Sequence, residues 1–87
     1  MDERRRVRRI QIFKSAKVTF NGVLRDCVMR DISSLGARLA FVSTAYIPEN
    51  FALTFDMART LRGCRVAWRS STEIGVEFRD ISFRSAA

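Results

Sequence analysis

The chain has 87 residues, which is enough for one small domain but too few for two independent cores. Hydrophobic residues make up 47% of it, which argues against disorder, and no apolar run approaches the roughly 20 residues needed to cross a bilayer. The formal net charge is +7 with no histidine at all, which excludes histidine-based catalytic triads and histidine metal sites. None of the acidic residues falls in a catalytic arrangement, so the composition predicts a binding protein without cofactor or metal and not an enzyme.

The N-terminus and the two cysteines bear on the compartment. The first residues are charged and no apolar stretch follows them, so we expect no signal peptide and a cytoplasmic protein. Cys27 and Cys64 lack CxxC spacing and have no histidine to join them in a metal site. We therefore expect two reduced, partly buried thiols.

In chain order, residues 1–9 form a charged segment without apolar periodicity, which predicts a flexible basic arm. From Ile10 onward apolar and polar residues alternate, which predicts a strand near 12–20. Asn21-Gly22 suits a type I′ turn, because both central residues of that turn need positive φ. The arm is therefore followed by a hairpin whose second strand lies near 23–31.

The rest of the chain continues the same alternation. Further strands are predicted at 37–42, 51–56, 61–69 and 73–78, with a loop or short helical turn at 43–50. On the strand at 61–69, Cys64, Val66 and Trp68 are expected to face the core. Trp68 is interpreted as a core residue, with a place at the border of a binding site as the alternative.

Six short strands with one-sided burial predict an all-β fold, a six-stranded antiparallel β-barrel or sandwich. The barrel would span residues 10–80 and leave 81–87 as a tail with at most a short helix. The pattern alone also permits an OB-fold or another small barrel.

Two motifs stand apart from this alternating background. The first is the arginine cluster, which places five arginines between positions 4 and 9. Taken alone it predicts a solvated arm or a contact with any polyanion. The second is Asp31-Ile32-Ser33-Ser34-Leu35-Gly36, in which a carboxylate can accept hydrogen bonds from the N1–H and N2–H₂ edge of guanine. Taken alone it is equally an ordinary Asx/Ser turn that ends in a glycine.

Together, in this order and about 20 residues apart, the motifs resemble the PilZ domain family of bacterial cyclic di-GMP receptors. The family signature is RxxxR in an N-terminal arm followed by [D/N]xSxxG on a β-barrel. Arg5 and Arg9 are the outer residues of one register, and Arg4 and Arg8 of another. The first register is preferred because Ile10, where the strand pattern starts, directly follows Arg9.

The resemblance implies the ligand cyclic di-GMP and a set of contact residues. Those of the first rank are Arg5, Arg9, Asp31, Ser33 and Gly36, and those of the second rank are Arg4, Arg6, Arg8 and Arg38. Arginine would stack on guanine or grip phosphate, while Asp31 and Ser33 would take the opposite side. Binding would order the arm and change a surface that signals in trans to an unidentified partner protein.

Two other functions compete with this hypothesis. A PilZ-like module that has lost its ligand would keep the barrel and act only by protein interaction. A nucleic-acid-binding barrel would explain the basic arm, but an acidic residue on its binding face would repel phosphate. Direct titration distinguishes the three.

Overall fold

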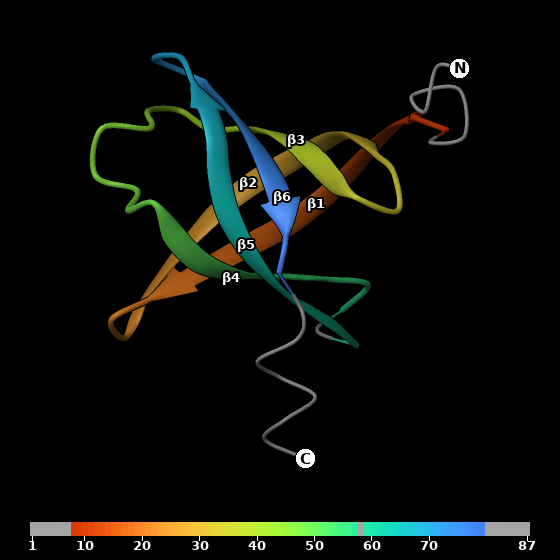
Figure 1. The fold of residues 1–87 in the computed structure, drawn as a ribbon. Coiled ribbons are helices and arrows are strands. Elements are labelled where there is room, and N and C mark those ends of the chain that lie inside the picture. The colour runs from red at the N-terminus through yellow and green to blue at the C-terminus, as the bar shows by residue number, and fades with distance from the viewer. Residues whose placement is uncertain (1–7, 58, 80–87) are drawn as a thin grey trace.

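The alternating segments form six strands that close into a barrel (Figure 1). The computed structural model describes residues 8–57 and 59–79, and within these ranges it contains no helix. The strands are β1 (Ile10–Phe20), β2 (Val23–Ile32), β3 (Gly36–Ala40), β4 (Asn50–Phe55), β5 (Thr60–Arg69) and β6 (Glu73–Phe78). Every neighbouring pair is antiparallel in the closed order β1-β2-β3-β6-β5-β4, so the predicted six-stranded antiparallel barrel is confirmed.

The strand limits lie within two residues of the predicted ones. The first strand starts at Ile10, two residues before the predicted start, and the third covers Gly36–Ala40 instead of 37–42. Most of the predicted arm (residues 1–7) and the predicted tail at 81–87 lie outside the described residues. Nowhere in 8–57 and 59–79 does a helix meet the length and apolarity that a membrane span requires.

The core of the barrel is formed by inward side chains from all six strands, with Cys64 as the buried core residue of β5. The side chains with essentially no solvent exposure are Val18, Met29, Leu39, Leu53 and Ile74. Cys27 and Cys64 are both buried, and burial, followed by the charge of Asp26, raises the pKa of the Cys27 thiol to about 12. A thiol with so high a pKa is almost entirely protonated at neutral pH, so Cys27 acts as a small apolar core residue.

The prediction that Trp68 of the fifth strand faces the core was wrong. Cys64 is buried and Val66 packs against the core, but Trp68 is 45% exposed. Between Val66 and Trp68 the pairing of β5 with β6 shifts register, so Trp68 lies opposite Gly75 while Val66 lies opposite Val76. A bulge of one residue moves every later side chain to the other face of a strand. The tryptophan therefore lies on the outside of the barrel.

The hairpin between β1 and β2 has the predicted turn. Asn21 has φ 50° and Gly22 has φ 77°, as a type I′ turn requires.

No atom lies within 4 Å of where a Cβ of Gly22 would stand, so the strain of Gly22→Ala is conformational only. We expect the substitution to destabilise the domain by about 1 kcal/mol and to lower its Tm by about 4–8 °C. Thermal unfolding followed by circular dichroism measures this, and an unchanged Tm would contradict it. Asn21→Asp is the control, because aspartate also tolerates positive φ.

Candidate functional site

A pocket of about 560 Å³ lies where β3, β5 and β6 meet the turn between β2 and β3. Its walls include Arg9, Ser33, Gly36, Arg38, Trp68 and Glu77. These residues come from four separate parts of the sequence, and the strand order β1-β2-β3-β6-β5 places side by side the strands that carry or adjoin them (Figure 1). Four of the predicted contact residues thus surround one pocket.

Asp31 lies between two of the arginines that line this pocket. The residue is only 4% exposed, and its Oδ2 accepts a hydrogen bond from Nε of Arg38 at 2.9 Å. Its Oδ1 receives no hydrogen bond from any described residue, and Nε of Arg9 lies 3.7 Å from it in an ion pair. A buried acceptor with no donor is unfavourable, so this oxygen is suited to a donor that a ligand brings.

Ser33 is fixed by the turn that connects β2 to β3. Its hydroxyl oxygen accepts hydrogen bonds from the backbone N–H groups of Leu35 and Gly36 at 3.1 and 3.3 Å. Its own N–H donates to the carbonyl oxygen of Gly36 at 2.8 Å. The motif therefore forms a Ser turn, one of the two interpretations of its sequence, and the turn holds Ser33 in the pocket wall.

Gly36 is required by close packing of two backbones. A Cβ on Gly36 would stand 2.0 Å from the carbonyl oxygen of Val76 on β6. No side chain fits there, so the glycine lets β3 and β6 approach each other at the floor of the site.

Trp68 lies across a second glycine in the same pocket. A Cβ on Gly75 would stand 2.1 Å from Nε1 of Trp68, so the indole ring occupies the space above the β6 backbone. The ring is about half exposed and borders the pocket. An exposed indole face fixed against a rigid strand is a stacking platform for a nucleobase.

The carboxylate of Glu77 stands at the edge of the pocket. It is paired with Nη2 of Arg65 at 3.3 Å and with Nη1 of Arg79 at 3.7 Å. These two cations offset its charge, so Glu77 adds little repulsion against an anion.

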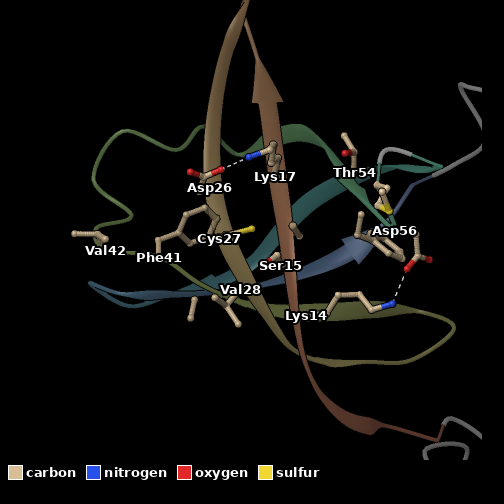
Figure 2. Close-up of a pocket in the computed structure, with 14 residues that line it drawn as sticks. Lys14, Ser15, Lys17, Asp26, Cys27, Val28, Phe41, Val42, Thr54 and Asp56 are labelled. Carbon is tan, nitrogen blue, oxygen red and sulfur yellow. Dashed lines mark hydrogen bonds and ion pairs between the residues drawn. The ribbon is translucent and has the colours of Figure 1, made fainter.

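A larger pocket, of about 1060 Å³, lies against β1, β2 and β4 and collects none of the predicted contact residues (Figure 2). The lysines that line it are each paired with a carboxylate, Lys14 with Asp56 and Lys17 with Asp26. The two lysines of this lining are matched by two carboxylates, whereas Arg9 at the smaller pocket is held only by a 3.7 Å ion pair and keeps a side chain that is 65% exposed, so the pocket at Arg9 is better suited to an anion.

The chain is similar to known proteins in both sequence and fold. A family model described as the PilZ domain matches residues 3–87, nearly the whole chain. The chain belongs to the PilZ domain family. No curated relative matches the sequence. Among solved structures, the crystal structure of the Borreliella burgdorferi PlzA protein in complex with c-di-GMP is similar, with a TM-score of 0.67 and 20% identity. The similarity covers 85% of this chain and 34% of the PlzA chain, so this PilZ domain spans about a third of that protein's length.

The structure describes the second motif of this PilZ domain completely but the arginine cluster only in part. Arg9, Ser33, Gly36 and Arg38 line the pocket, and Asp31 lies between the two arginines. Arg8 is exposed and is not part of the pocket lining. The other predicted contacts, Arg4, Arg5 and Arg6, lie outside the described residues.

Two members of the site were not predicted as contact residues. Trp68 was assigned to the core, with the border of a binding site as the alternative, because the alternation gave no sign of the bulge. Its exposed position in the pocket lining agrees with that alternative. Glu73, which accepts a hydrogen bond from Nη1 of Arg38 at 2.9 Å, is 35 residues from its partner. For Trp68 the sequence does hold one signal, since the isolated Gly75 inside a strand pattern indicates close approach by another group. For Glu73 it holds none, because the contact depends on barrel closure.

Proposed function

We propose that this PilZ domain binds cyclic di-GMP in the pocket at Arg9 and functions as a ligand receptor without catalytic activity. The observation that carries the proposal is the meeting of the two motifs: Arg9 of the arginine cluster lies 3.7 Å from the buried carboxylate of Asp31. The two residues are 22 positions apart in the sequence, and the fold brings Asp31 next to an arginine of the pocket wall. The similarity to PlzA, whose structure contains this ligand, agrees with the assignment.

In this proposal each residue contacts the part of the ligand that suits its side-chain chemistry. Arg5 and Arg9 supply guanidinium groups that stack on a guanine or donate in pairs to phosphate or to O6 and N7. Asp31 accepts from the N1–H and N2–H₂ edge of guanine, and Ser33 borders the same edge. Arg4, Arg6 and Arg8 add positive charge for the two phosphates.

The output is a changed surface that a partner protein recognises. Cyclic di-GMP adds two negative charges next to the arginine cluster and covers the pocket wall. A partner that contacts this face meets a different charge and shape in the two states, which gives it a differential affinity. The domain thus signals in trans.

Calorimetric titration of the full chain with cyclic di-GMP at physiological salt tests the proposal. Saturable binding that GTP and duplex DNA do not displace is the expected result. Displacement by duplex DNA, with a steep dependence on salt, would instead indicate a nucleic-acid-binding barrel. Absence of binding would indicate a PilZ domain that acts only by protein interaction.

Trp68 provides both a variant and an optical probe of this pocket. It is the single tryptophan of the chain, so intrinsic fluorescence reports from the site alone. Stacking of a base on an aromatic ring contributes roughly 1–3 kcal/mol, so we expect Trp68→Ala to weaken cyclic di-GMP binding about tenfold and Trp68→Phe less. Tyr46→Ala is the matched control, since Tyr46 is 79% exposed on a loop outside the pocket. Equal affinity of Trp68→Ala and the unaltered chain would show that no base stacks there.

A further inference from the structure

Arg38 is held by two carboxylates from the strands on either side of its own. It extends from β3, its Nε donates to Oδ2 of Asp31 on β2, and its Nη1 donates to Oε2 of Glu73 on β6, both at 2.9 Å. Hydrogen bonding to Asp31, and then to Glu73, raises the pKa of Arg38 above its ordinary value. With two of its nitrogens engaged in opposite directions, the guanidinium is fixed in the plane between three strands.

This arrangement determines how Asp31 is presented. The carboxylate is 6% exposed at its side chain, and Arg38 engages only Oδ2. Oδ1 is left without a hydrogen-bond donor among the described residues. Nε of Arg9 lies 3.7 Å from Oδ1 in an ion pair, and the side chain of Arg9 is 65% exposed, so that side chain can move away when a ligand enters. Arg38 therefore fixes which oxygen of Asp31 remains available.

We propose that Arg38 and Glu73 are positioning residues that make the site selective for guanine, by holding Asp31 with Oδ1 available to the base. The inference rests on the proposed function and adds to it the origin of base specificity. An ionised carboxylate accepts hydrogen bonds and donates none, so it favours a base edge that presents donors. Guanine presents N1–H and N2–H₂ on that edge, hypoxanthine presents N1–H alone, and adenine has an acceptor at N1.

Arg38 is distinct from the arginines that contact the ligand. Its two engaged nitrogens point at protein carboxylates, so it acts on the ligand through Asp31. Without it, the buried carboxylate loses its hydrogen-bond donor and is free to rotate toward Arg9. The result would be a site that still attracts a dinucleotide through its arginines but no longer distinguishes the bases.

The test compares the dissociation constants of cyclic di-GMP and cyclic di-IMP, which differ only in the N2 amino groups. For the unaltered chain we expect cyclic di-GMP to bind about tenfold more tightly, as a site built for a donor rejects the analogue that lacks it. Arg38→Met, which removes all donors at nearly constant length, is expected to weaken cyclic di-GMP about tenfold and to reduce the ratio below about three. Arg38→Lys and Glu73→Gln should give intermediate ratios, since each keeps part of the hydrogen bonding.

Arg25→Met is the matched control, because it removes one arginine charge from an exposed position of β2 outside the pocket. This variant should leave the ratio of the two dissociation constants, cyclic di-IMP over cyclic di-GMP, at about ten. If Arg38→Met weakens both ligands equally, Arg38 has only a structural role and the inference is wrong. It is also wrong if the unaltered chain binds both ligands alike, although the proposed function then stands. Failure of the unaltered chain to bind cyclic di-GMP would refute the proposed function itself. Thermal unfolding identifies a variant that does not fold, and Glu73→Gln then carries the test.

Discussion

Replacing Arg9 by alanine is expected to weaken cyclic di-GMP binding about 100-fold, because hydrogen bonds to charged groups contribute about 1.5–3 kcal/mol each and Arg9 can donate several. Within the part of the chain that the structure describes, Arg9 is the first-rank arginine, and it lies in the pocket wall next to the carboxylate of Asp31. Its side chain is 65% exposed, so it can reach a ligand without any rearrangement of the barrel. Calorimetric titration measures the loss directly.

Arg8→Ala is the control, and it also decides between the two registers of the RxxxR motif. Both substitutions remove one positive charge from adjacent positions, so general attraction of an anion falls equally. If Arg5 and Arg9 form the motif, Arg8→Ala should weaken binding less than about fivefold. If Arg4 and Arg8 form it, Arg8→Ala should weaken binding more than Arg9→Ala does. Equal and small losses in the two variants would show that the arginine cluster acts only as a diffuse positive charge.

The strands were predictable because burial on one side of a sheet imposes an alternation that a sequence displays directly. Glu73–Phe78 was predicted with its observed limits, and Asn21-Gly22 was identified from a conformational requirement that few dipeptides satisfy. Both features depend only on residues that are close in sequence.

Trp68 could not be placed because its face depends on a break in that local pattern. Up to Val66 the strand follows the alternation, and a single extra residue in the β5–β6 pairing then turns the tryptophan outward. The space that the indole ring occupies lies on the partner strand, above Gly75. A single strand pattern contains no information about its partner.

The candidate site shows the same division. Arg9, Asp31, Ser33 and Gly36 belong to short motifs and were predicted together. The role of Arg38 was not, since its partners Asp31 and Glu73 lie 7 and 35 residues away and meet it only in the barrel order β2-β3-β6. A motif identifies residues that contact a ligand, whereas the residues that hold those contacts in place are defined by tertiary pairing.

Gly36→Ala is expected to be the most destabilising single change near the site. The added Cβ would stand 2.0 Å from the carbonyl oxygen of Val76, and a backbone atom in a paired strand cannot move away as the end of a side chain does. Overpacking of this kind costs about 3 kcal/mol, which for a domain of this size lowers the Tm by roughly 12–24 °C. Thermal unfolding followed by circular dichroism tests the value.

Comparing Gly36→Ala with Gly22→Ala distinguishes two physical requirements that only glycine meets at these positions. At Gly22 the space is open and φ is positive, so the cost of a Cβ is conformational and about 1 kcal/mol. At Gly36 the backbone is not in the positive-φ region, so the cost of a Cβ is steric. The added Cβ must therefore push β3 and β6 apart. Because the N–H of Gly36 also donates to the hydroxyl of Ser33, that separation should weaken cyclic di-GMP binding even well below the Tm of the variant. A Gly36→Ala variant with the stability of Gly22→Ala would show that the two strands can yield without cost. One that is destabilised yet binds normally would show that the turn at Ser33 does not need its present geometry.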